Sequence, residues 1–197
     1  MSEPLPDLPP HANSNRLPFV LLGVLMIGCV AFLKWQGRVW WCACGHAWPV
    51  ILNVNSSHNS QHLFDPYVFS HVLHGVLFFG LAWIFADRFN LSWRFLLAAA
   101  VEIAWEMAEN SPLVIDRYRN ATVSLGYTGD SIVNSLGDII GFAAGFFLAR
   151  AIGLWASIAV GVVIELGMLW LIRDNLTLNV LMLIWPIDAV RKWQSGG

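Results

Sequence analysis

Five long apolar runs, each near the length that crosses a lipid bilayer, constrain this sequence more than any other feature. About 20 helical residues rise about 30 Å, which is the thickness of the hydrocarbon core. The runs cover residues 17–33, 67–86, 95–113, 131–149 and 154–172. They predict an all-α fold, a polytopic transmembrane helix bundle of five spans.

The composition agrees with a membrane setting. Hydrophobic residues make up 57% of the 197 residues and charged residues only 12%, against roughly 25% charged residues in soluble domains. The mean hydropathy is +0.59. A net charge of −2 provides no basic patch for nucleic acid, so the expected partner is the lipid bilayer.

The remaining segments define the domain organisation. Residues 1–16 are rich in proline and polar groups and lack the features of a cleaved signal peptide, so we expect a disordered tail. Residues 17–197 then form a single transmembrane domain. A further apolar run, 176–187, is about 12 residues long, which suits a re-entrant or interfacial helix and leaves a short sixth span open.

The distribution of basic residues favours one orientation. If the last run crosses, Arg191 and Lys192 join the side of the N-terminus and make that side the more basic one, as is typical of the cytoplasmic side. We therefore expect a cytoplasmic N-terminus. The long segment at about 34–66 would then be extracytoplasmic.

Three glutamates interrupt the third run in the stretch VEIAWEMAEN. Glu102, Glu106 and Glu109 are spaced i, i+4, i+7, so they share one face of a helix. Glu109 and the following Asn110 could simply end the helix in water, but this explanation does not cover Glu102. An ionised side chain at the bilayer centre costs on the order of 3 kcal/mol. Protonation, a cation or a metal ion must therefore neutralise the stripe.

A second polar stripe lies on the fourth run. Asp130, Asn134 and Asp138 are spaced i, i+4, i+8, and glycines share nearly the same side, namely Gly137, Gly141 and Gly145. Small residues at this spacing allow a neighbouring helix to approach closely, so the stripe is expected to face protein. For Asp130 the simpler role is to cap the helix.

The second run adds histidines at the same expected depth. His71 and His74 are spaced i, i+3 in FSHVLHG, and two arginines follow the glutamate helix in IDRYRN. Together these residues predict a polar cavity in the outer half of the bilayer. The candidate ligand-binding residues are His71, His74, Glu102, Glu106, Glu109, Arg117, Arg119, Asn134 and Asp138.

Several of these motifs carry a resemblance. The segments HVLHG, EIAWEMAENSPLVIDRYR and GYTGDSIVNSLGDIIG, with WCACG upstream and DNLTLNVLMLIWP downstream, resemble an uncharacterised family of alphaproteobacterial multi-pass proteins of the cell inner membrane. More distantly, the order of polar helices is similar to that of VanZ-like membrane proteins, although Glu106 stands where their pattern tends to have glutamine. The resemblance implies a bacterial inner-membrane location and topology, and neither family supplies a reaction.

A cysteine and histidine cluster lies between the first two runs. The motif CACGH and the following SSHNSQHLFD supply residue types that ligate zinc or copper, namely Cys42, Cys44, His46, His58, His62 and Asp65. The two closely spaced cysteines could instead form a disulfide or remain free. The spacing matches no recognised metal motif, so all three states stay open.

Binding is the first of three functions that fit the predicted cavity. A non-enzymatic protein would hold an amphiphilic or lipid-linked compound, with Arg117 and Arg119 at an anionic head group. A proton-coupled carrier that uses Glu102 and Asp138 as a relay is the third. The small size and the lack of repeated halves speak against a carrier.

A membrane-embedded, metal-dependent hydrolase is the second function. His71, His74 and Asp138 would hold a divalent metal ion, and Glu106 would be the catalytic general base toward a bound water. The absence of an H-E-x-x-H signature speaks against this chemistry. The sequence favours binding and leaves open whether the protein is an enzyme.

Overall fold

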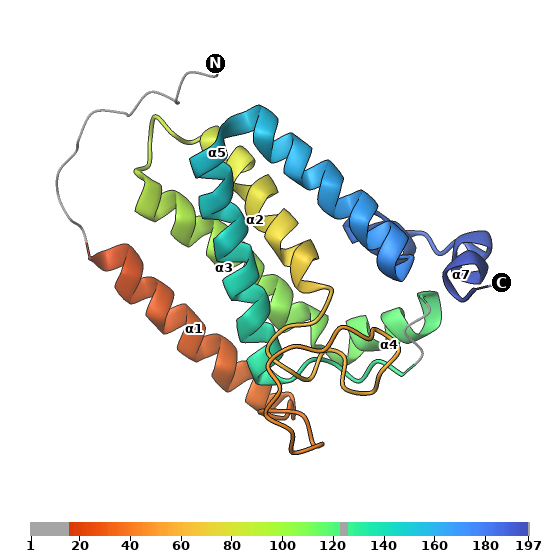
Figure 1. Ribbon diagram of the computed structural model, residues 1–197. Helices are drawn as coiled ribbons and strands as arrows, with labels where there is room; N and C mark the ends of the chain where they lie inside the picture. Colours follow the sequence, from red (N-terminus) through yellow and green to blue (C-terminus); the bar gives the residue numbers. More distant parts are fainter. Residues whose placement is uncertain (1–15, 123–125, 197) are drawn as a thin grey trace.

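The computed structural model describes residues 16–122 and 126–196, and every regular element within these ranges is an α-helix (Figure 1). The all-α class is therefore confirmed. The tail predicted at 1–16 lies outside the described residues except for Arg16. In chain order the helices are α1 (Leu17–Trp35), α2 (Val68–Trp83), α3 (Leu91–Glu109), α4 (Pro112–Ala121), α5 (Ile132–Ile172), α6 (Leu176–Ile184) and α7 (Asp188–Gln194).

Local capping chemistry sets where several helices begin. The side chains of Asn90, Ser111 and Asn175 accept hydrogen bonds from backbone N–H groups at the starts of α3, α4 and α6. At the start of α5 the cap is Ser131, whose hydroxyl accepts from the Asn134 N–H at 3.1 Å. The expectation that Asp130 caps this helix is thus wrong, and its carboxylate is available for other contacts.

Among the helices of the described residues, two are long and apolar enough to cross a membrane, α1 and α5. Most of their apolar stretch is not buried within the chain. Exposed fractions reach 72% at Ile27 and 83% at Trp170. The helix α2 is apolar but has only 16 residues, so five spans are not confirmed. The helix α6 has nine residues, about 13 Å by helical rise, which is too short to cross.

The long helix α5 contains a sharp bend that makes two arms of it. At Gly153 the backbone has φ 77° and ψ 177°, which is not helical and which L residues with a side chain rarely adopt. Figure 1 shows the first arm meeting the second at this point and the chain running back in the opposite direction. The runs predicted at 131–149 and 154–172 are these two arms.

The glycine stripe of α5 packs directly against α2. A Cβ atom on Gly141 would lie 2.7 Å from the side chain of Val68, and one on Gly145 would lie 2.8 Å from the carbonyl carbon of Val72. From the other side, Gly75 of α2 faces the α5 backbone at Phe142. The prediction that this face is the packed one is confirmed. Since the backbones touch, residues on the same faces are held at fixed separations.

The segment between α1 and α2 has little regular structure and covers the start of α5. Its carbonyl groups accept hydrogen bonds from the first backbone N–H groups of that helix: Val39 from Ile132 at 2.8 Å, and Ser60 from Ser131 at 2.9 Å. These N–H groups have no partner within a helix. The segment therefore adds acceptors, beside the Ser131 side chain, for the N–H groups at the end of α5 that carries the polar stripe.

Candidate functional site

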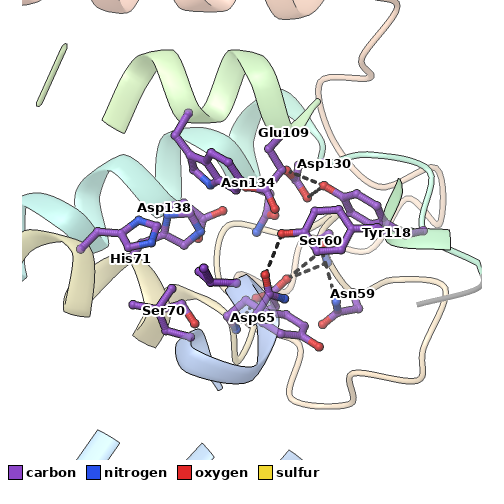
Figure 2. Close-up of a pocket in the computed structure, with 17 residues that line it drawn as sticks. Asn59, Ser60, Asp65, Ser70, His71, Glu109, Tyr118, Asp130, Asn134 and Asp138 are labelled. Carbon is purple, nitrogen blue, oxygen red and sulfur yellow. Dashed lines mark hydrogen bonds and ion pairs between the residues drawn. The ribbon is translucent and has the colours of Figure 1, made fainter. Parts of the chain in front are cut away.

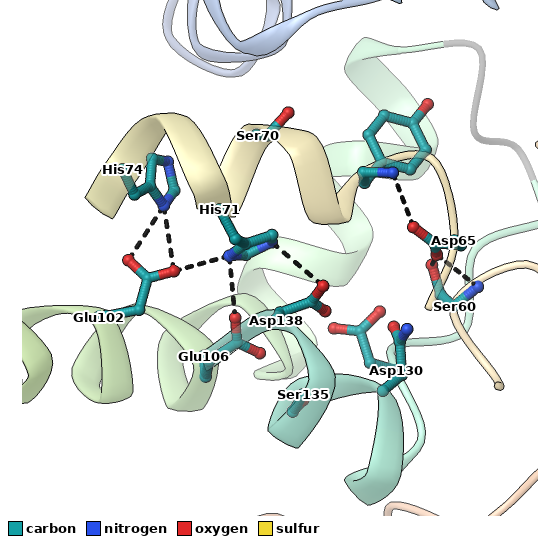
Figure 3. A network of polar contacts seen from close by, with 12 residues as sticks. Ser60, Asp65, Ser70, His71, His74, Glu102, Glu106, Asp130, Ser135 and Asp138 are labelled. Carbon is teal, nitrogen blue, oxygen red and sulfur yellow. Dashed lines mark hydrogen bonds and ion pairs between the residues drawn. The ribbon is translucent and has the colours of Figure 1, made fainter. Parts of the chain in front are cut away.

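His71 lies at the centre of a buried polar cluster formed by α2, α3 and α5 (Figure 3). Its Nδ1 atom is 2.6 Å from Glu102 Oε1 and 3.3 Å from Glu106 Oε1. Both glutamates have an exposed fraction of 0%. On the next turn of α2, His74 Nδ1 is 3.0 Å from Glu102 Oε2. The shared face predicted for the glutamates thus meets the two histidines.

The helix α5 adds a third carboxylate to the cluster. Asp138 Oδ1 is 4.0 Å from His71 Nε2, on the opposite side of the imidazole ring from the glutamates. Within the described chain, neither oxygen of Glu106 nor Oδ1 of Asp138 has a hydrogen-bond partner. Three carboxyl groups face two imidazoles, and unpaired buried charges are costly. A proton or a further cation must complete the cluster.

A pocket of about 680 Å³, including its open mouth, adjoins the cluster (Figure 2). Five residues predicted for the site line it: His71, His74, Glu109, Asn134 and Asp138. Glu102 and Glu106 do not line the pocket, but they contact His71, which does. The pocket therefore joins predicted residues from three helices.

Several lining residues were not predicted for the site. The polar ones include Asp65, Tyr67, Tyr118, Tyr127, Asp130 and Asn179, and the apolar ones are Trp105, Leu176 and Val180. Trp105 comes from α3, and the others come from loops, helix ends and the short helices α4 and α6, which are far apart in the sequence. The tyrosines carry no local signal for such a site, because no spacing relates them to the polar stripes.

A buried hydrogen-bond network forms one side of the pocket. Asn110 donates from Nδ2 to Asp130 Oδ2 at 2.9 Å, and its own Oδ1 accepts from the Asp130 N–H at 2.7 Å. The Tyr127 hydroxyl donates to Asp130 at 3.0 Å. Asn110 has an exposed fraction of 0%, so the idea that it ends the helix in water is wrong. It joins the end of α3 to the start of α5.

The predicted arginines are placed elsewhere. Arg117 donates to the carbonyl groups of Leu183 and Ile184 at the end of α6, at 2.7 and 3.2 Å. Arg119 donates to the Tyr127 carbonyl at 2.6 Å. Among the described residues no arginine or lysine lines the pocket. Its lining is therefore acidic and rich in hydroxyl and amide groups.

Asp65 also belongs to the pocket rather than to the cysteine motif. Its carboxylate accepts from the Ser60 N–H at 2.8 Å and from the Tyr67 N–H at 2.7 Å, as Figure 3 shows in part. Burial raises the pKa of Asp65 above its ordinary value, and these hydrogen bonds oppose the increase.

The stability of the protein should depend on the pH through Asp130. Burial, with a contribution from nearby Asp65, raises the pKa of Asp130 from 3.8 to about 6. The proton bound in the folded state stabilises the fold below pH 3.8, and this contribution is lost as the pH rises through about 6. From pH 5 to pH 7.5 the parent should lose roughly 1 to 1.5 kcal/mol more than Asp130→Asn. Thermal unfolding in one detergent measures this difference.

The control for this experiment is Asp87→Asn, because Asp87 is exposed in the connection between α2 and α3. That variant should follow the pH dependence of the parent. Parallel curves for the parent and Asp130→Asn would show that this carboxyl group does not titrate with a raised pKa.

The fold and the site define a class of protein: a small all-helical chain with two membrane-capable helices and a buried histidine–carboxylate cluster beside an acidic pocket. The chain belongs to the family described as "Protein of unknown function (DUF2585)", whose model matches residues 33–196. The predicted resemblance to an uncharacterised alphaproteobacterial family is thereby confirmed.

Relatives within this family are similar over most of their length. A UPF0314 protein of Sinorhizobium fredii is 53% identical over 182 residues, covering 88% of this chain and 91% of the relative. UPF0314 proteins of Agrobacterium fabrum and Paracoccus denitrificans are 46% and 44% identical; they cover 94% and 90% of this chain, and the matches span 93% and 92% of the relatives. No solved structure matches the chain. The likeness to VanZ-like proteins is not shown by these matches.

Proposed function

We propose that the chain is a multi-pass protein of the bacterial inner membrane, with a cytoplasmic N-terminus, whose pocket binds an amphiphilic or lipid-linked compound. The observation that carries this proposal is the composition of the pocket. Carboxylate, hydroxyl and amide groups line its interior, whereas Trp105, Leu176 and Val180 supply apolar surface. Such a lining suits a molecule with a polar head group and an apolar chain.

The charge of the pocket indicates which head group it takes. Asp65, Glu109, Asp130 and Asp138 line it, and no basic side chain of the described residues opposes them apart from the two histidines. An anionic head group would be repelled, which departs from the role expected of Arg117 and Arg119. We infer a head group that donates hydrogen bonds, such as an amine or a hydroxyl-rich sugar.

The membrane location rests on exposed apolar surface. The helix α1, and the helix α5 from Ile140 onward, present large exposed apolar side chains, and a soluble domain rarely exposes contiguous apolar surface of this extent. Lipid is the environment in which such a surface is stable.

Blocking the mouth of the pocket tests the binding function. Val180 lines the pocket and is 44% exposed, whereas its neighbour Leu181 is 37% exposed and does not line it. Decylamine, decyl glucoside and decyl phosphate serve as probes in thermal unfolding of the protein in nanodiscs. The first two should raise the unfolding temperature of the parent and of Leu181→Trp, and should have at least a tenfold weaker apparent affinity for Val180→Trp, about 1.4 kcal/mol.

Decyl phosphate should stabilise none of the three proteins by more than its alkyl chain accounts for. Equal responses of Val180→Trp and Leu181→Trp to decylamine would place binding outside this pocket. A preference for decyl phosphate would contradict the inferred head-group chemistry, even if the pocket is the binding site.

A metal-dependent hydrolase is the second candidate, and one observation favours it. Donor atoms of His71, Glu106 and Asp138 lie within 4.8 Å of one another, and three of the four carboxylate oxygens have no hydrogen-bond partner among the described residues. Imidazole and carboxylate donors suit a divalent transition metal, and the bond to Glu102 would orient the imidazole. In this arrangement Glu106 is a metal ligand rather than the general base.

Metal analysis decides between the two candidates. A divalent ion that stays with purified protein, and that is lost from Glu106→Gln, would support the hydrolase. Metal-free protein that still binds decylamine would leave amphiphile binding as the function of the site.

A further inference from the structure

Two cysteines and two histidines of the segment between α1 and α2 gather in one place. Cys42 Sγ is 3.1 Å from His58 Nδ1, and Cys44 Sγ is 3.5 Å from His62 Nε2. One donor atom from each of the four residues lies within 4.8 Å of the others. The cysteines are free thiols, so all four side chains are available as ligands.

The spacing of these donor atoms matches that of a tetrahedral metal site. Zinc binds cysteine sulfur at about 2.3 Å and histidine nitrogen at about 2.0 to 2.1 Å. Tetrahedral angles then separate neighbouring donors by about 3.3 to 3.8 Å, close to the two sulfur–nitrogen distances observed here. The other donor pairs lie within 4.8 Å of each other, so shifts of about 1 Å would let the four donors surround one ion.

His62 is oriented for metal binding by a second contact. Its Nδ1–H donates to the backbone carbonyl of Trp48, which leaves Nε2 as the unprotonated nitrogen, directed at Cys44. Zinc-bound histidines commonly donate a hydrogen bond from the N–H of their other ring nitrogen to a carbonyl or carboxylate. Packing helps to fix the ring, since His62 is 1% exposed and Trp41 meets it edge-on at 5.1 Å.

The other candidates in this segment are engaged elsewhere. The His46 ring stacks on Trp48 with centroids 4.7 Å apart, and it is not part of the donor group. Asp65 is bonded to Ser60 and Tyr67. The ligand set is therefore two cysteines and two histidines, and this combination is typical of structural zinc sites with no open position.

We propose that Cys42, Cys44, His58 and His62 bind one zinc ion that fixes the α1–α2 segment over the start of α5. None of these four residues lines the pocket, and the proposal does not depend on the proposed function. Two carbonyl groups near these residues accept hydrogen bonds from backbone N–H groups at the start of α5: that of Val39, which precedes the cysteines in the chain, and that of Ser60, which lies between the two histidines. The His62 carbonyl itself accepts from Asn134 Nδ2 at 2.8 Å. Bonds to the ion would hold this segment in place, which hydrogen bonds of regular secondary structure do not do here.

Zinc content of the full-length protein tests the proposal. Protein purified in detergent without a polyhistidine tag should contain about one zinc ion per chain. Cys42→Ser, Cys44→Ser and His62→Ala should each lose most of it. The matched controls are His46→Ala, a neighbouring histidine outside the donor group, and Cys29→Ser, a thiol buried in α1. Both controls should retain the ion.

A measurement on the unmodified protein covers the case in which the cysteine variants do not fold. An organomercurial that reacts with thiols should release the zinc of the parent protein, seen with a chromogenic chelator. Cobalt substituted for zinc should give thiolate-to-metal charge-transfer absorption. Zinc that is absent while Cys42 and Cys44 are recovered as a disulfide would overturn the proposal. So would an ion retained in Cys42→Ser but lost in His71→Ala, since it would belong to the buried cluster.

Discussion

Replacing Gly145 by alanine is expected to lower the free energy of unfolding by about 3 kcal/mol, a large effect for one added methyl group. The new Cβ atom would lie 2.8 Å from the carbonyl carbon of Val72 and closer still to its oxygen. Those atoms belong to the backbone of α2, which cannot turn away as a side chain can. The two helices would have to separate, and the contacts that position His71 against Asp138 would loosen with them.

The matched control is Gly161→Ala on the second arm of α5. A Cβ atom there would meet Leu73 at 3.7 Å, an ordinary contact distance. Alanine also favours a helix over glycine by up to about 1 kcal/mol, so this variant should be as stable as the parent or slightly more stable. Thermal unfolding in detergent and the yield in the membrane fraction measure both variants. Equal stability of the two would mean that α2 does not pack on the glycine face.

Removing the His71 imidazole should destabilise the protein by about 3 to 5 kcal/mol, because buried carboxylates lose their charged partner. Glu102 lies 2.6 Å from this ring, Glu106 3.3 Å and Asp138 4.0 Å. His71→Ala would leave all three without it. His74→Ala should cost clearly less, because His74 pairs with one described carboxylate of the cluster, Glu102, and its side chain is 16% exposed.

A second substitution shows that the loss comes from the unpaired carboxylates. Glu102→Gln keeps the shape of the side chain and removes its charge, so it should restore part of the stability of His71→Ala. The effects of two substitutions in one buried network on the free energy of unfolding differ from their sum by roughly 0.5 to 3 kcal/mol, whereas the effects of substitutions at distant sites are additive. Unfolding of the two single variants and the double variant measures this coupling. Strict additivity would place His71 and Glu102 in separate environments and remove the cluster on which the site is built.

Much of the helical framework follows from local sequence. The apolar runs placed α1, α2, α3 and both arms of α5, because helix length and hydrophobicity are properties of a continuous stretch. Helical periodicity likewise placed the three glutamates on one face of α3 and the three glycines on one face of α5. The glycine stripe predicted that a neighbouring helix packs closely against α5. The structure shows that this helix is α2, which the spacing of the glycines could not identify.

Other features depended on residues far apart in the chain. The five predicted spans are not confirmed, because among the described helices α1 and α5 meet the length and hydropathy of a membrane span, whereas α2 is apolar but shorter. Arg117 was expected at the site from its position in a loop, yet it donates to carbonyl groups of α6, 66 residues away. In the structure Arg117 lies on α4; its long charged side chain can reach several partners, and sequence spacing does not select among them.

The sequence by itself determined the all-helical class, the apolar faces and the residue types of both sites, because periodicity, length and ligand chemistry are local. The tertiary structure alone decided which of those residues meet. It joined Asn110 to Asp130 across the α3–α5 connection, and it directed His62 at Cys44 while Asp65 turned to Ser60. These choices depend on how α2 and the segment before it pack against α5, and packing geometry cannot be read from the spacing of residues along one helix.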